Sequence, residues 1–114
     1  MNVSRIKMNA PILNVLDLSI EQEFGVTIEE LQSKDRTRFI SQCRALYTNF
    51  AHQLVGCLTM KELGALVNRS HCNIIWQIRK QPDWLDFDRE YKSMYERLQN
   101  KFNQLKNEKE NGMV

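Results

Sequence analysis

The chain has little of what marks secreted, metal-binding or β-sheet proteins. It has only three cysteines, Cys43, Cys57 and Cys72, and no CxxC spacing, so we expect reduced thiols without a zinc or disulfide framework. The first 18 residues contain only a short apolar run broken by Asn and Asp, which is neither a secretory signal nor a membrane span. Four glycines, two prolines and no two-residue alternation argue against a sheet. These absences predict an all-α, cytoplasmic protein that does not contact membranes.

Signatures of catalysis and nucleotide hydrolysis are missing as well. No Ser-His-Asp order or carboxylate pair stands out, and neither GxxxxGKS nor GxxxxGKT occurs. His71 and Cys72 are adjacent on a predicted helix and so point in different directions, which argues against a shared zinc ion. A redox role for Cys72, near Arg69 at a helix N-terminus, is the alternative. We therefore expect neither enzymatic activity nor a bound cofactor or metal.

The sequence does contain a helix-turn-helix pattern at about residues 59–80. Thr59 and Glu62 have the spacing of a capping box, which predicts a helix beginning at Met60. Gly64 removes a side chain where another helix could come close. The apolar positions of this first helix share one face and are Leu63, Leu66 and Val67.

The second helix of the pattern should begin after a turn formed by Asn68 and Arg69. Ser70 can cap it, and Pro82 should end it. Its predicted inward-facing residues are Ile74, Ile75 and Ile78. A helix-turn-helix directs the first turn of this helix at base edges, and here that turn is polar.

Positive charge is concentrated in the middle of the chain. Residues 34–80 contain eight Lys and Arg against two acidic residues, a formal +6, so the other 67 residues must sum to −4 to give the net +2. A basic region around a candidate recognition helix is what phosphate neutralisation requires, and it would make binding salt-dependent.

The segment from residue 12 to about 80 resembles the C-terminal DNA-binding domain of the bacterial replication initiator DnaA. Its landmarks are an opening apolar helix, then FGVTIEELQSKDRTRFISQCRALYTNFAHQL, which contains a basic loop and a basic helix, then LGALVNRSHCNIIWQIR. Their order is more specific than a single short motif. The resemblance implies an all-α, Trp-repressor-like helical bundle that binds duplex DNA in the major groove, with an arginine in the minor groove.

If the family's roles carry over, nine residues contact DNA. Arg36 reaches the minor groove, and a cluster at the second helix approaches bases or nearby phosphates in the major groove. The cluster consists of Ser70, His71, Cys72 and Asn73, and the predicted phosphate contacts are Arg38, Arg44, Lys61 and Arg69. Where the family has aspartate and two threonines, this chain has Ser70, Cys72 and Asn73, so its preferred site should differ from the usual DnaA box.

The domain prediction is one helical DNA-binding domain over residues 11–106, between a flexible terminus at 1–10 and a frayed terminus at 107–114. Helices before the helix-turn-helix are expected over about Pro11–Phe24, after a capping box at Thr27 and Glu30, and over about Asp35–Val55.

The region after the helix-turn-helix is expected to be a turn, QPDWLDFD, followed by a long helix from about Phe87 to Lys106. The apolar stripe of that helix either folds back over the body or pairs in a dimeric coiled coil, so the chain is a monomer or a weak dimer. The stripe consists of Phe87, Tyr91, Met94, Leu98, Phe102 and Leu105.

The leading functional hypothesis is sequence-specific binding of double-stranded DNA in the control of replication initiation or of transcription, with replication or transcription proteins as further partners. The alternative is a protein interaction module that kept the fold and lost DNA binding. Its contact surface would be the aromatic residues Trp84, Tyr91, Tyr95 and Phe102.

Overall fold

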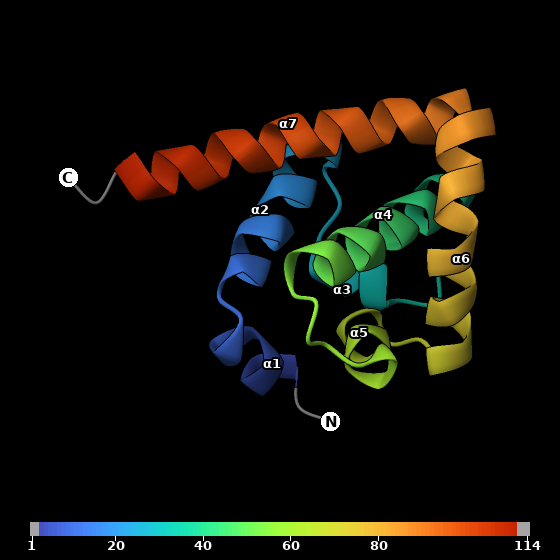
Figure 1. Cartoon of the computed structure of the whole chain (residues 1–114), viewed down its shortest axis with the longest axis horizontal. Helices are drawn as coiled ribbons and strands as arrows, with labels where there is room; N and C mark the ends of the chain where they lie inside the picture. The colour runs from blue at the N-terminus through green and yellow to red at the C-terminus, as the bar shows by residue number, and fades with distance from the viewer. Residues whose placement is uncertain (1–2, 112–114) are drawn as a thin grey trace.

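The computed structural model describes residues 3–111, with side chains described through Glu108, and it confirms the all-α prediction: this range contains seven helices and no strand (Figure 1). The helices are α1 (Val3–Asn9), α2 (Ile12–Phe24), α3 (Ile28–Gln32), α4 (Arg38–Leu54), α5 (Met60–Val67), α6 (His71–Phe87) and α7 (Arg89–Asn111). No helix in the described range is long and apolar enough to cross a membrane.

Helix α4 lies at the centre and is surrounded by the other helices (Figure 1). Leu46 and Tyr47 of α4 are fully buried, and the Tyr47 hydroxyl donates to Asp17 of α2 at 2.5 Å. Burial, and then the Asp17 carboxylate, raise the pKa of Tyr47. Cys43, on the same helix, is also in the core, where burial raises its thiol pKa to about 12. The core therefore depends on one central helix.

Helix α1 occupies the segment that the sequence predicted to be a flexible terminus. Ile6 is buried in the core, and Lys7 forms an ion pair with Asp17. The prediction of a flexible terminus was wrong for residues 3–9, because one buried side chain, Ile6, and one ion pair, from Lys7 to Asp17, hold α1 against the rest of the chain. Residues 1 and 2 lie outside the described range.

Helices α2 and α3 match their predicted ends. Gly25 caps α2 with φ +70°, and Thr27 and Glu30 form the reciprocal capping box of α3. Helix α4 begins at Arg38 rather than near Asp35. The Asp35 carboxylate accepts from the Thr37 backbone N–H at 2.8 Å, which lowers its pKa and holds residues 35–37 in a turn.

Helix α6 does not end at Pro82 but continues through it to Phe87, so the predicted turn at QPDWLDFD was wrong. Proline removes one helical hydrogen bond, and packing on both sides of it holds the helix together. The Trp84 ring contacts Trp76 at a centroid distance of 5.6 Å and Tyr91 at 5.2 Å. The chain turns at Asp88 instead, which leaves Phe87 84% exposed and outside the predicted stripe.

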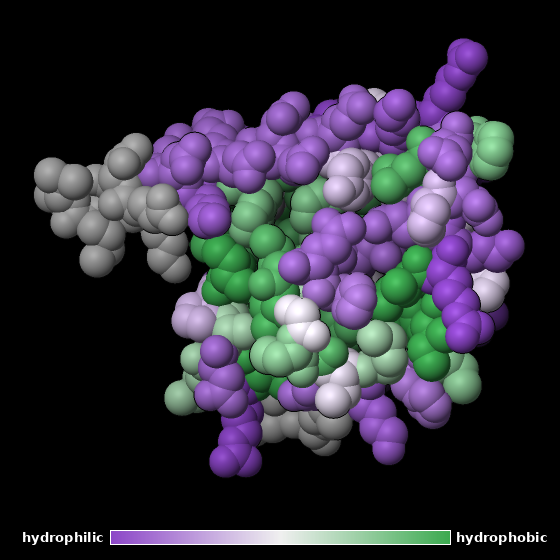
Figure 2. Space-filling view, viewed as in Figure 1, coloured by the Kyte–Doolittle hydropathy of each residue, from purple (hydrophilic) through white to green (hydrophobic). Residues whose placement is uncertain are grey.

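Helix α7 folds back across the ends of α2 and α6, as one of the two alternatives predicted (Figure 1). Leu98 and Phe102 are buried, and Arg97 donates to Glu23 at 2.9 Å while lying over the Phe24 ring. Figure 2 shows a hydrophilic outer side of α7 and apolar side chains beneath it. The stripe therefore closes the core of its own chain.

The helix also extends beyond the predicted end at Lys106. Residues 107–111, predicted to fray, are helical, and residues 112–114 lie outside the described range.

Candidate nucleic-acid interface

Helices α5 and α6 form the helix-turn-helix that the capping residues predicted. The Thr59 hydroxyl accepts from the Glu62 backbone N–H at 3.1 Å, and the Glu62 carboxylate accepts from the Thr59 backbone N–H at 3.0 Å. Asn68 adopts the left-handed conformation at the turn, with φ +57°. Ser70 then caps α6, its hydroxyl accepting from the Asn73 backbone N–H at 3.3 Å. Local sequence signals thus fix where both helices begin.

Gly64 permits the tight turn between the two helices. A Cβ at this position would lie 2.3 Å from the backbone oxygen of Arg69, which is far inside van der Waals contact. The Arg69 backbone N–H donates to the Gly64 carbonyl at 2.8 Å, so the two segments are in direct backbone contact. A close approach is present at Gly64 as predicted, but the backbone that comes close is the turn at Arg69 and not another helix.

The basic loop over residues 33–37 is fastened to α4 by the buried Arg44 and to the helix-turn-helix by the half-buried Arg69. Arg44 donates to the carbonyls of Leu31 at 2.7 Å, Ser33 at 3.3 Å and Asp35 at 2.9 Å. Arg69 donates to the same Ser33 carbonyl at 2.8 Å. Two side-chain amides complete the connection. The Gln32 amide donates to the Leu66 carbonyl, and the Asn68 amide donates to the Gln32 carbonyl. The loop is therefore held in a defined place beside α6.

The predicted role of Arg44 as a phosphate contact is wrong. Its side chain is in the core at 4% exposure, and three backbone carbonyls use its donors. Burial, and then the charge of Arg69, lower its pKa. Helical spacing leaves Arg44 off the apolar stripe of α4, but it cannot reveal that α3 and the loop cover that side of the helix. Arg44 is a structural residue of the interface.

Other predicted contact residues are exposed. Ser70, His71, Cys72 and Asn73 are exposed at the start of α6, as is Lys61 on α5. The Cys72 sulfur lies 3.7 Å from His71 Nε2. No group of three or more His, Cys, Asp or Glu side chains within the described range could hold a metal ion.

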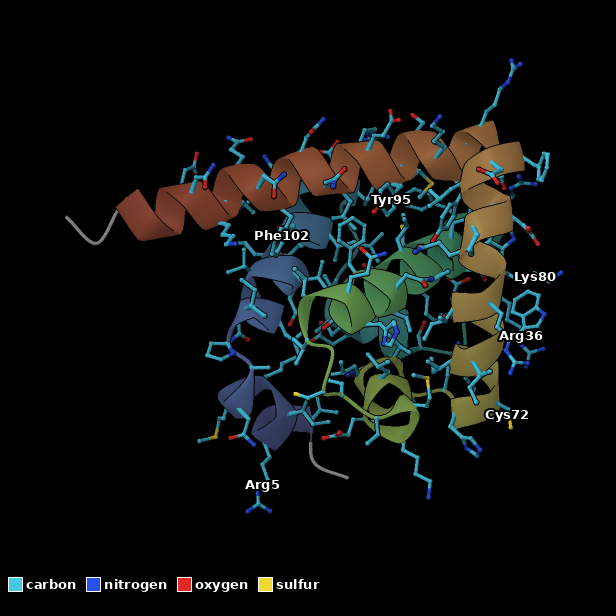
Figure 3. The ribbon with its side chains drawn as sticks, in the orientation of Figure 1. Arg5, Arg36, Cys72, Lys80, Tyr95 and Phe102 are labelled. Atoms are coloured by element: carbon cyan, nitrogen blue, oxygen red, sulfur yellow. The ribbon has the colours of Figure 1, made fainter. Side chains whose placement is uncertain are left out.

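The two arginines of the basic loop differ in their partners. Arg36 is exposed, and its side chain makes neither a hydrogen bond nor an ion pair with any described residue. Arg38 is also exposed but lies 3.9 Å from Asp88 and 3.4 Å from Glu90. Figure 3 shows Arg36 at the same edge of the molecule as Cys72 and Lys80. Loop and helix thus present cations and the polar first turn along one edge.

Two residues of this edge were missed from the sequence. Trp76 is 54% exposed, and Lys80 is exposed. Trp76 and Lys80 follow Asn73 at spacings of three and seven, so helical periodicity could have identified them. The sequence prediction placed the DNA contacts of α6 in its first turn alone.

Gln77 was missed for a different reason, because it is buried beneath the edge at 7% exposure. Its Nε2 donates to the Asn73 Oδ1 at 2.7 Å, which fixes the orientation of the exposed Asn73 amide. No sequence signal distinguishes this glutamine from a solvated one.

The paired helices, the fastened basic loop and the exposed polar first turn define a helix-turn-helix domain of the nucleic-acid-binding class. The chain belongs to the family of bacterial DnaA protein helix-turn-helix domains, whose sequence model matches residues 16–80, more than half of the chain. That confirms the resemblance. A search of curated proteins finds no match. The family match ends at Lys80, before Pro82 and α7.

Proposed function

We propose that this protein binds double-stranded DNA in a sequence-specific manner through the edge formed by α6 and the basic loop. The observation that carries the proposal is the placement of Arg36. The two arginines that anchor its loop hold it beside the exposed turn of α6, and its own guanidinium has no protein partner in the described range. An unpaired cation beside a helix-turn-helix is available to phosphates or to the minor groove.

The roles known for the family suggest that different residues of this edge contact bases, the minor groove and phosphates. His71, Cys72 and Asn73 contact base edges, Arg36 enters the minor groove, and Lys61 contacts phosphates. Arg69, predicted as a further phosphate contact, instead donates to the Ser33 and Asn68 carbonyls and positions the loop. The Asn73 amide can make a two-pronged contact with adenine, and Cys72 offers an apolar surface to a thymine methyl. The preferred site therefore differs from the usual DnaA box.

The mechanism is occupancy rather than chemistry. With no phosphate-cradling sequence loop and no catalytic constellation, the domain acts by covering sites that a full initiator or a polymerase needs, or by marking an origin for partners. Control of replication initiation, on a chromosome or a mobile element, and control of transcription both follow from that mechanism.

The alternative interaction module loses its predicted contact surface. Tyr91 and Phe102 are buried, and Trp84 and Tyr95 are half-buried within the chain's own packing. Buried side chains are not available to a protein partner, so Tyr91 and Phe102 drop out of the predicted contact surface.

The test is a fluorescence anisotropy titration of labelled mixed-sequence duplex at 50 and 200 mM salt. We expect binding that weakens by at least about tenfold between the two, because several phosphate contacts release counterions. Binding insensitive to salt, or none at micromolar protein, would remove the proposal.

A further inference from the structure

A cleft of about 760 Å³ lies between the first half of α4, α6 and the start of α7. Its wall combines arginine side chains, aromatic rings and carboxamides. Part of it lies along the edge proposed for DNA, but it continues past the end of the family match, to Trp84 and Tyr91. Recognition of duplex DNA by the first turn of α6 does not account for this distal half.

The aromatic part of the wall is a continuous row. Trp76 and Trp84 meet edge to face with centroids 5.6 Å apart, and Trp84 and Tyr91 are tilted at 54° with centroids 5.2 Å apart. Trp76 is half exposed, so one end of the row is open to a ligand. A row of this kind offers stacking to a planar heterocycle such as a nucleobase, whatever its sequence context.

Two carboxamides in the wall have acceptor oxygens without donors. The Oε1 atoms of Gln42 and Gln77 are buried and accept no hydrogen bond from any described residue. The Gln77 Nε2 is already engaged by Asn73, so the amide orientation leaves its oxygen as the free group. A buried acceptor without a donor is unfavourable, and a ligand with N–H groups would satisfy it.

The cleft mouth carries positive charge. Arg36 lines it without a protein partner, and Arg38 lines it while paired with Asp88 and Glu90. Guanidinium groups bind phosphate oxygens through charge-assisted hydrogen bonds. A ligand suited to this cleft therefore joins a planar, N–H-bearing ring to a phosphate.

We propose that the cleft binds a single nucleotide unit, with guanosine monophosphate as the best-fitting case. The base stacks on Trp76, and the phosphate meets Arg36. The N–H groups of the base donate to the Oε1 atoms of Gln42 and Gln77 after both carboxamides turn toward it, which releases the Gln77 hydrogen bond to Asn73. Guanine carries two neighbouring donor groups on one edge, whereas uracil carries one. The unit is either a free nucleotide or an unpaired nucleotide of a DNA strand. Duplex binding by the α6 edge is not required.

The chain provides its own reporter for this site. It contains two tryptophans, and both line the cleft, so two indole N–H signals in a ¹⁵N NMR spectrum of the full chain monitor it. Addition of GMP should shift both signals in a saturable manner, and UMP should bind about tenfold more weakly, since it offers fewer donors. Inorganic phosphate alone should not shift the Trp84 indole N–H signal.

Two variants separate the contacts. Gln77→Met removes the acceptor at similar length and should weaken GMP about tenfold while a control spectrum shows the chain folded. Arg36→Ala should weaken GMP but not guanosine, which lacks the phosphate. Arg79→Ala is the matched control, because Arg79 is an exposed α6 cation that does not line the cleft.

The source of the nucleotide is distinguished with two DNA hairpins, one fully paired and one with a single unpaired deoxyguanosine. A Trp84 shift seen with the unpaired deoxyguanosine and not with the paired hairpin assigns the site to a DNA strand, and a shift with GMP alone assigns it to free nucleotide. If neither ligand shifts Trp84 at millimolar concentration, or if UMP equals GMP, the proposal is overturned. Failure of the paired hairpin to bind at all would instead refute the proposed duplex function and leave the GMP result unaffected.

Discussion

Two arginines eight residues apart, Arg36 and Arg44, have opposite environments. Arg44 is buried and donates to three backbone carbonyls, whereas Arg36 is exposed and has no partner in the described range. Arg44 holds the loop in place, and the loop presents Arg36 to solvent. Some cations of a basic segment are therefore buried and serve the fold. A count of Lys and Arg in the sequence then overstates the number of side chains that can contact DNA.

The largest effect is expected for Arg44→Ala. The substitution leaves three loop and helix-end carbonyls without their donor, and we expect the free energy of unfolding to fall by about 3 kcal/mol. Urea denaturation followed by circular dichroism measures it. Arg36→Ala is the control and should change stability by less than about 0.5 kcal/mol. Equal stability losses in the two variants would end the distinction between the two arginines.

Gly64→Ala tests the close packing of the turn between α5 and α6. The new Cβ would lie 2.3 Å from the Arg69 carbonyl oxygen, so the turn must shift. We expect a loss of about 1 to 3 kcal/mol in unfolding free energy, despite the better helix propensity of alanine. Gly56→Ala is the matched control, since a Cβ there meets nothing within 4 Å. A neutral Gly64→Ala would show that the turn is not closely packed.

Arg36→Ala should weaken duplex binding by about 1 to 3 kcal/mol if Arg36 makes a base contact in the minor groove. Loss of a phosphate contact would instead flatten the salt slope by about one unit for every sequence. Anisotropy titrations at several salt concentrations separate the two cases. Arg97→Ala is the control, because Arg97 of α7 is engaged with Glu23 of α2. Unchanged affinity for Arg36→Ala would remove this residue from the interface.

Gln77→Glu should alter sequence preference more than affinity. A carboxylate at this position has no N–H to donate, so the Asn73 amide would turn and present its oxygen and nitrogen in exchanged places. We expect the preference for adenine opposite Asn73 to relax, measured by competition among duplexes that differ at single positions. An unaltered preference would mean that Gln77 does not orient Asn73.

The smallest effect is expected for Glu90→Gln. Arg38 lies 3.4 Å from Glu90, and this exposed pair holds the arginine away from other anions. Removing the carboxylate should raise DNA affinity by about twofold, in keeping with the small energies of surface ion pairs. The same titration measures it, with Glu96→Gln as an exposed control on α7. Weaker binding by Glu90→Gln would exclude competition between Glu90 and DNA.

Local signals in the sequence predicted the elements that local interactions determine. The capping boxes at Thr27 and Thr59, the cap at Ser70 and the close approach at Gly64 are all present where spacing placed them. Helix ends decided by tertiary packing were not predictable in this way. The aromatic contacts of Trp84 extend α6 through Pro82, against the local rule.

The site was predictable to a similar extent. Exposed positions in the first turn of α6 followed from the capping residue, but the burial of Arg44 depends on α3 and on a loop that spacing along α4 cannot report. The hydrogen bond from Gln77 to Asn73 required coordinates. Sequence patterns identified the interface and missed the residues that orient it.

Selection of bound duplexes from a random-sequence pool is the most direct test that this edge recognises DNA sequence. We predict enrichment of one preferred site, with adenine at the position facing Asn73, and a changed preference at that position for Asn73→Thr. Recovery of no enriched sequence, or the same site for both proteins, would contradict the account.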